Sequence, residues 1–204
     1  MKLFYAPGVC SIGIHMLMEE IGKPYEAIAV NFAERAQYKP DFTSVNPKSK
    51  VPTLIDDEGT VRTEYPAIAY WLARKNPYSN LLPDDIDLQA KVLEIMDYCV
   101  ATLHMRGFTR MFRPAMFAPS AADEDAVKAA GREIVENGLA QLDKELQGKD
   151  YIVGKFSIAD SAVFYLEFWA KRSGVPMPPN VATHFERIMA RPSTRRMLKA
   201  EGLA

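Results

Sequence analysis

Every strand-like segment of this chain lies within its first 63 residues, and helical periodicity is the only regular pattern that follows them. Residues 2–5 and 25–30 carry aromatic and β-branched side chains, which favour strands. Residues 51–55 and 60–63 flank an acidic turn that contains glycine, a pattern typical of a β-hairpin. A sheet in this protein therefore has to come from the N-terminal part of the chain.

Two helical segments accompany these strands. The first begins at Ser11, after a loop of turn residues, and ends at Gly22 with Pro24 just beyond it, which is a common way for a helix to stop. The second runs from about Glu64 to Arg74. The predicted order is therefore β-α-β followed by β-β-α.

The remainder of the chain is predicted to be helical. Residues 86–112 and 123–146 have the periodicity of long helices. Ser157 and Asp160 have the spacing of a capping box, which opens an apolar helix that ends near Gly174. Two short helices are expected to finish the chain.

A stretch dense in Pro, Asn and Asp separates the two kinds of structure. We predict an α/β domain over residues 1–77, a linker over residues 78–85, and an all-α domain over residues 86–204.

The charge balance argues against two classes of partner. The chain of 204 residues has 25 basic and 26 acidic side chains and a formal net charge of -1. No basic stripe points to nucleic acid or to a membrane surface. We expect no signal peptide and no membrane span, because the N-terminus runs directly into a strand and no long apolar run exists.

The two cysteines are predicted to differ in role. A disulfide framework and a metal site are not expected, and this cysteine usage is typical of a reducing, cytoplasmic compartment. Cys99 lies mid-helix among apolar residues and is predicted to be a core residue. Cys10 lies between a strand and a helix, where unpaired N–H groups favour a thiolate. The alternative for Cys10 is a small side chain buried under the turn.

Because no second cysteine stands near Cys10, a mixed disulfide with a small thiol is its natural redox product. Pro52 follows Val51 at the mouth of a strand, which indicates either a simple strand-entry proline or a cis peptide bond that offers the Val51 backbone to an extended ligand. The residues alone leave both readings open. His15, on the helix after Cys10, is interpreted as a packed histidine rather than a base.

Four ordered motifs span essentially the whole chain. They are Tyr5-x-Pro7-Gly8-x-Cys10-Ser11, Asn46-Pro47-Lys48-x-x-Val51-Pro52-x-Leu54, Thr63-Glu64-x-x-Ala67-Ile68 and Phe156-Ser157-Ile158-Ala159-Asp160. Together they resemble a glutathione S-transferase, and the short Pro-Gly-x-Cys-Ser motif resembles the bacterial beta class. This resemblance implies a thioredoxin-like N-terminal domain, an all-helical C-terminal domain and a homodimer.

The resemblance also implies a glutathione site. Cys10 would lie against the glutathione sulfur, with Tyr5 and Ser11 lining that region. Val51 would pair its backbone with the cysteinyl part of glutathione, and Pro52 would be cis. Glu64 would take the ammonium group of the γ-glutamyl part. The remaining positions expected to bind glutathione are Arg35, Lys50 and Tyr65.

Two positions depart from the family pattern. Tyr65 stands where a small hydroxyl residue is usual, which reduces one ligand contact to the backbone N–H. A histidine expected from the first long helix of the second domain matches either His104 or a site occupied by Met105, depending on the alignment. Arg106, Arg110 and Arg113 follow at helical spacing, as a cationic wall or as a solvated face.

The resemblance implies that this protein activates the glutathione thiol for attack on a hydrophobic electrophile, or exchanges thiols and disulfides through Cys10. Thiol transferase or peroxidase side activity and a role in detoxification are part of this expectation, and no metal is required. The wall for the second substrate is expected to comprise Met105, Phe108, Phe112, Met116 and Trp169. The alternative is a non-catalytic glutathione-binding or stress-related interaction protein on the same scaffold.

Overall fold

The computed structural model describes all residues 1–204, and they form two compact units. Unit 1 comprises residues 1–83 and 188–204, and unit 2 comprises residues 84–187. The sequence assigned everything after residue 86 to the helical domain, whereas the last residues of the chain pack in unit 1. The physical reason is that the final helix lies against the first one.

Unit 1 contains a mixed four-stranded sheet with helices around it. Its strands have the order β2-β1-β3-β4. The β1–β2 pair is parallel, and the β1–β3 and β3–β4 pairs are antiparallel. These strands are β1 (Lys2–Tyr5), β2 (Glu26–Ala29), β3 (Thr53–Ile55) and β4 (Val61–Thr63). The expected β-α-β and β-β-α order, and with it the thioredoxin-like fold, is confirmed.

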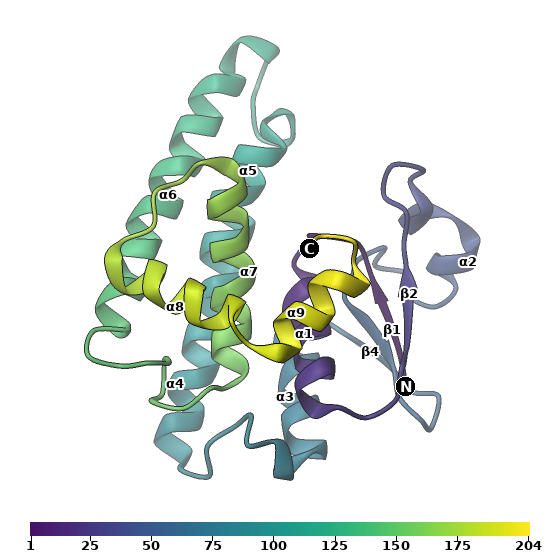
Figure 1. The fold of residues 1–204 in the computed structure, drawn as a ribbon. Coiled ribbons are helices and arrows are strands. Elements are labelled where there is room, and N and C mark those ends of the chain that lie inside the picture. The colour runs from purple at the N-terminus through teal and green to yellow at the C-terminus, as the bar shows by residue number, and fades with distance from the viewer. The chain divides into compact units, whose positions relative to one another are not determined.

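The helices of unit 1 lie on both sides of this sheet. Figure 1 shows α1, α3 and α9 on one side and α2 on the other. Leu3, Ile12 and Leu54 are fully buried in this unit. The elements are α1 (Ser11–Ile21), η1 (Ala36–Tyr38), α2 (Pro40–Thr43), α3 (Tyr65–Lys75), η2 (Pro77–Ser79) and α9 (Pro192–Ala200).

Unit 2 is entirely helical. Residues Ile158–Ala170 of its helix α7 are buried without interruption, so α7 forms the core of this unit. The predicted helix over residues 86–112 is continuous but changes type, because its middle part is a π-helix. The elements are α4 (Ile86–Asp97), the π-helix η3 (Tyr98–Phe108), α5 (Thr109–Phe112), η4 (Pro114–Met116), η5 (Ala121–Asp123), α6 (Glu124–Glu145), α7 (Ile158–Ser173) and α8 (Pro179–Met189).

Two glycines of α6 allow it to approach the π-helix closely. A Cβ atom at Gly131 would stand 2.8 Å from the carbonyl oxygen of Gly107, and one at Gly138 would stand 1.9 Å from a methyl carbon of Leu103. A Cβ atom at either position would force a neighbouring group to move, so the two glycines permit the close packing of α6 against the π-helix. No helix in the structure is long and apolar enough to cross a bilayer.

The predicted capping box at the start of α7 is confirmed and extends further than the sequence indicated. Asp160 Oδ2 accepts hydrogen bonds from the Ser157 N–H at 2.7 Å and the Ser157 hydroxyl at 2.9 Å. Its Oδ1 accepts the Ile152 N–H at 2.9 Å and lies 3.2 Å from His184 Nε2. Burial opposes the charged imidazole, but Glu167 and Asp160 outweigh it and raise the pKa of His184 to about 10. Asp160 therefore ties three segments of unit 2 together through a buried charge.

We predict that Asp160→Ala lowers the free energy of unfolding by about 3 kcal/mol or more, because it removes a cap and leaves His184 without one of its two carboxylates. Urea unfolding measures this value. The matched control is Asp123→Ala, which removes an exposed capping box with Ser120 and should cost about 1 kcal/mol. Equal losses for the two variants would contradict the role given to the buried network.

Candidate active site

The Cys10 sulfur lies where two loops of unit 1 meet. The loop from Ala6 to Cys10 connects β1 to α1, so Cys10 stands at the helix N-terminus as predicted. Its Sγ donates a hydrogen bond to the carbonyl oxygen of Val51 at 3.6 Å. The Val51–Pro52 peptide bond is cis, which settles the choice that the sequence left open. The structure thus brings Cys10, Val51 and Pro52 together.

The structure opposes the ionisation of Cys10 that its place at a helix N-terminus favours. Burial raises the pKa of the Cys10 thiol to about 12, and the backbone N–H groups of Ser11 and Cys10 and the charge of Lys50 lower it by less. The residue as a whole is partly exposed, so the burial concerns the sulfur at the Val51 carbonyl. This geometry favours the protonated thiol, which acts as a hydrogen-bond donor.

The loop that presents Val51 is held by a buried asparagine, which sequence reasoning did not single out as functional. The Asn46 side-chain amide donates to the Lys50 carbonyl at 2.9 Å and to the Thr53 hydroxyl at 2.8 Å. Its oxygen accepts the Lys48 N–H at 3.0 Å. The Asn-Pro pair at 46–47 is the turn signal that pointed to this loop. Val51 stands just outside the β-ladder, which begins at Thr53.

Glu64 lies beside this loop. Thr63 pairs with Thr53 across β3 and β4, so Glu64 directly follows the residue opposite the start of β3. Glu64 has a positive φ of 70°, a conformation that is costly for a residue with a side chain and that concentrates at ligand sites. Its carboxylate accepts the Lys48 ammonium at 2.7 Å. Both side chains are more than half exposed, so this ion pair is weak and exchangeable.

Lys48 is a second residue that sequence reasoning missed. Its ammonium donates to Glu64 and also to the Thr63 hydroxyl at 2.9 Å. Glu64 was predicted to bind an ammonium group of the ligand, and Lys48 supplies the same chemical group from within the protein. Tyr65, the residue after Glu64, has a buried side chain. Its backbone, in the first turn of α3, is therefore the part of this residue that a ligand could meet. An ammonium-binding carboxylate thus stands next to the Val51 loop.

The two cationic residues expected here behave differently. Lys50 is exposed, and its charge acts on the Cys10 thiol, which places it at this site. Arg35 is also exposed, but its guanidinium carbon lies over the Tyr38 ring at 5.4 Å from the ring centre. The contact of Arg35 is thus with its own loop rather than with Cys10 or Val51.

The two residues predicted to line the sulfur region, Ser11 and Tyr5, lie in the interior of unit 1. Ser11 is fully buried, and its hydroxyl bonds to the N–H and the carbonyl oxygen of Ala6, each at 3.2 Å. Tyr5 is buried with its ring 4.9 Å from that of His15. Burial, followed by the charge of Glu201, raises the pKa of the Tyr5 phenol. Ser11 therefore secures the start of the loop, whereas Tyr5 packs against α1.

In unit 2, the predicted substrate wall divides into a buried and an exposed part. Phe108 is fully buried and its ring centre lies 5.5 Å from that of Phe112 and 5.4 Å from that of Trp169. Met105, Phe112 and Met116 are 50%, 49% and 66% exposed. Phe108 and Trp169 therefore pack beneath Phe112, while Met105 and Met116 are exposed side chains of the same unit.

His104 and Met105 have different surroundings within unit 2. The His104 ring lies 4.7 Å from the Trp169 ring and 5.8 Å from the Tyr165 ring, so it packs against α7. Met105, one residue further, is half exposed. The Arg110 guanidinium lies over the Phe117 ring at 4.5 Å and donates to the Arg106 backbone carbonyl, so this cation covers its own helix.

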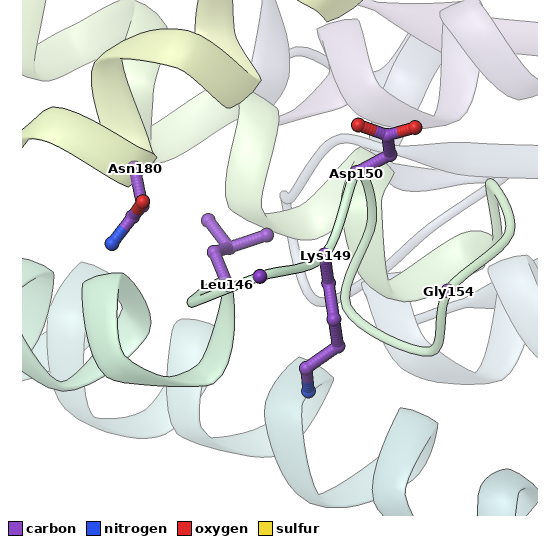
Figure 2. A pocket seen from close by; sticks show the side chains of 6 residues that line it. Leu146, Lys149, Asp150, Gly154 and Asn180 are labelled. Atoms are coloured by element: carbon purple, nitrogen blue, oxygen red, sulfur yellow. The ribbon is translucent and has the colours of Figure 1, made fainter.

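A separate concavity of about 510 Å³ in unit 2 lacks the features of a reactive site. Figure 2 shows its lining, in which the Lys149 and Asp150 side chains point in different directions. Lys149 donates to the Ile152 carbonyl and Asn180 bonds to Asp143, so these polar groups are engaged within the protein. Polar groups that converge on a ligand are absent from this lining.

No group of three or more His, Cys, Asp or Glu side chains is arranged to hold a metal ion.

Comparisons with known proteins agree with this geometry. Two family models match the chain, "Glutathione S-transferase, N-terminal domain" over residues 9–75 and "Glutathione S-transferase, C-terminal domain" over residues 100–192. The sequence is 34% identical over 208 residues to glutathione S-transferase GstA of Escherichia coli O157:H7, with 100% of each chain covered.

Solved structures give the same result. A sphingomonad glutathione S-transferase complexed with glutathione is 38% identical, with a TM-score of 0.86 and 100% of each chain covered. A bacterial beta-class glutathione S-transferase of Sphingomonas chungbukensis is 36% identical, with the same TM-score and coverage.

We predict that the alkylation rate of Cys10 by iodoacetamide rises about tenfold per pH unit from pH 7 to about 10 without a plateau, because only the thiolate reacts. Peptide mass spectrometry locates the modified residue. Lys50→Met should be slower at each pH, since it removes a charge that lowers the pKa of this thiol. A plateau at or below pH 8 would contradict the assignment of a protonated Cys10.

Proposed function

Because this chain belongs to the glutathione S-transferase family, we propose that it binds glutathione at Cys10, Val51 and Glu64 and activates the glutathione thiol for attack on an electrophile. The observation that carries the proposal is the juxtaposition of the Cys10 sulfur, the Val51 backbone and a carboxylate that already binds an ammonium group. The matching family models and relatives give no support to a non-catalytic binding protein as the alternative.

Each part of glutathione has a chemically suitable partner in unit 1. The γ-glutamyl ammonium replaces or joins the Lys48 ammonium on Glu64, and the carboxylate beside it meets the N-terminus of α3. The cysteinyl part pairs with the Val51 backbone, which the β-ladder leaves outside. Lys50, an exposed cation at the same loop, is available for the remaining carboxylate. Tyr65 contributes through its backbone.

A protonated Cys10 determines how the thiol is activated. Its S–H donates to the Val51 carbonyl and can turn to a sulfur placed beside it. Donation from Cys10 favours the charged form of the glutathione thiol, so its pKa falls and the proton leaves to solvent. The thiolate then attacks the electrophilic carbon, the new C–S bond forms, and the leaving group departs with its electron pair. Cys10 supplies a hydrogen bond in this reaction and forms no covalent bond.

Thiol exchange through Cys10 is a slower activity of the same site. It requires the Cys10 thiolate to attack a disulfide sulfur, and burial of this thiol keeps the thiolate fraction small at neutral pH. Exchange is therefore expected to increase with pH, whereas conjugation is available at neutral pH. Of the two activities that the resemblance implied, conjugation is therefore proposed as the main one at neutral pH.

The hydrophobic co-substrate is proposed to bind on the apolar surface of unit 2 formed by Met105, Phe112 and Met116. These three side chains are about half exposed or more, and the buried rings of Phe108 and Trp169 pack beneath Phe112. Methionines adapt to differently shaped apolar ligands, which suits a range of electrophiles. His104 faces Trp169 and is assigned to the support of this surface rather than to acid–base chemistry.

The cellular setting is proposed on the same basis. Both cysteines are free thiols, which is consistent with a reducing cytoplasm. The family resemblance supports a homodimer and a role in detoxification of electrophiles, with a peroxidase side activity on the same activated thiol.

Calorimetric titration of reduced glutathione tests the proposal. The wild-type protein is expected to bind, and Glu64→Gln is expected to bind about tenfold or more weakly, because a hydrogen bond to a charged group is lost. Lys48→Met serves as the matched control, since it frees the same carboxylate and should leave the affinity equal or higher. Absence of binding heat from the wild type at millimolar glutathione would contradict the proposed function.

A further inference from the structure

The last helical turn of the chain reaches the Cys10 loop from 193 residues away in sequence. Glu201 follows α9, and its side chain has no exposed surface. One carboxylate oxygen, Oε2, accepts the backbone N–H of Gly8 at 2.9 Å. A carboxylate that accepts a backbone N–H forms a charge-assisted bond, which is shorter and stronger than a neutral one. Gly8 stands two residues before Cys10.

The other oxygen of this carboxylate is fixed by a histidine on α1. Glu201 Oε1 lies 2.7 Å from His15 Nδ1, and the His15 side chain is also fully buried. His15 Nε2 has no hydrogen-bond partner, so Nδ1 makes the only hydrogen bond of this imidazole. The rings of Tyr5 and Tyr25 pack against it. The carboxylate is therefore held in one orientation, with one oxygen aimed at the loop.

The docking of α9 on α1 has other contacts that do not reach the loop. Arg196 pairs with Glu19 at 2.7 Å, and Arg191 pairs with Glu20. The Thr194 hydroxyl also bonds to Met16 Sδ at 3.1 Å. These contacts secure the helix without Glu201. The bond from Glu201 to Gly8 thus acts on the loop rather than on the helix.

Other restraints on the loop come from its own backbone and from side-chain packing. Gly8 has a positive φ of 70°, and the Val9 N–H reaches the Ala6 carbonyl over a long 3.3 Å. Ser11 bonds to Ala6 at the start of the loop, and Val9 packs against a buried cluster that contains Ala6 and Val51. The bond from Glu201 to the Gly8 N–H adds a restraint on the loop backbone from the far end of the sequence.

We propose that Glu201, held by His15, is a positioning residue that fixes the Gly8 backbone and thereby keeps the Cys10 sulfur at the Val51 carbonyl, where it meets glutathione. This inference rests on the proposed function for its catalytic consequence, but its structural consequence concerns Cys10 alone. Release of Gly8 lets the loop open, so water reaches the sulfur and the donor to the glutathione thiol is misplaced. Glutathione binding at Glu64 and Val51 is little affected.

The test compares Glu201→Met, Glu201→Gln and Arg196→Ala with the wild type. Met fills the buried space but accepts no hydrogen bond, whereas Gln keeps an oxygen for Gly8. Arg196→Ala is the matched control, since it removes a contact of α9 with α1 that does not touch the loop. Iodoacetamide alkylation of Cys10 and steady-state conjugation of glutathione to 1-chloro-2,4-dinitrobenzene are measured for each protein.

For Glu201→Met we expect alkylation faster by about fivefold or more, and kcat lower by about tenfold with KM for glutathione within about threefold. Glu201→Gln and Arg196→Ala should stay within about threefold of the wild type in all three values. If Glu201→Met does not fold, Glu201→Asp takes its place, because its shorter side chain cannot reach both Gly8 and His15. Alkylation and kcat unchanged in a folded Met or Asp variant would overturn the inference.

Alkylation requires no glutathione, so it separates this inference from the proposed function. A protein without conjugation activity whose Glu201→Met variant still exposes Cys10 would contradict the proposed function alone. A protein with conjugation activity whose Glu201→Met variant behaves as the wild type would overturn the positioning role alone.

Discussion

Desolvation of one sulfur atom governs the chemistry of this protein. Cys10 stands at the N-terminus of α1, which favours a thiolate, but its sulfur also lies against the Val51 carbonyl. Burial dominates and raises the pKa of the thiol to about 12. A cysteine in this state is a weak nucleophile and a good hydrogen-bond donor. The thiol that reacts is then the one supplied by glutathione.

Three distant parts of the sequence cooperate to maintain this arrangement. Asn46 pins the loop that presents Val51, and Ser11 closes the start of the Cys10 loop from inside. Glu201, from the last turn of the chain, holds Gly8. The C-terminal helix consequently belongs to unit 1 for a functional reason as well as for packing. Unit 2 contributes a different chemistry, an apolar surface supported by the aromatic side chains of Phe108 and Trp169.

The sequence predicted features that depend on local structure and missed those that depend on distant contacts. The order of strands and helices along the N-terminal part of the chain, the position of Cys10 and the capping box at Asp160 follow from short patterns, and all are found in the structure. The protonation state of Cys10 depends on a loop 41 residues away, and the role of Glu201 on a contact across 193 residues, so no local pattern revealed either. The choice between His104 and Met105 stayed open in the sequence because it depended on the alignment. Both lie in a π-helix, whose hydrogen bonds follow an i→i+5 pattern that α-helical spacing does not anticipate.

The most direct test of this account is an ultraviolet titration of thiolate absorbance in the glutathione complex of the wild type, Cys10→Ser and Cys10→Ala. We predict one thiolate per wild-type site at neutral pH, which persists in Cys10→Ser because a hydroxyl still donates a hydrogen bond. In Cys10→Ala the pKa of bound glutathione should rise by about one unit, since a hydrogen bond to the charged form is lost. A thiolate that disappears equally in both variants would show that Cys10 itself is ionised, and would contradict the claim that it acts as a donor.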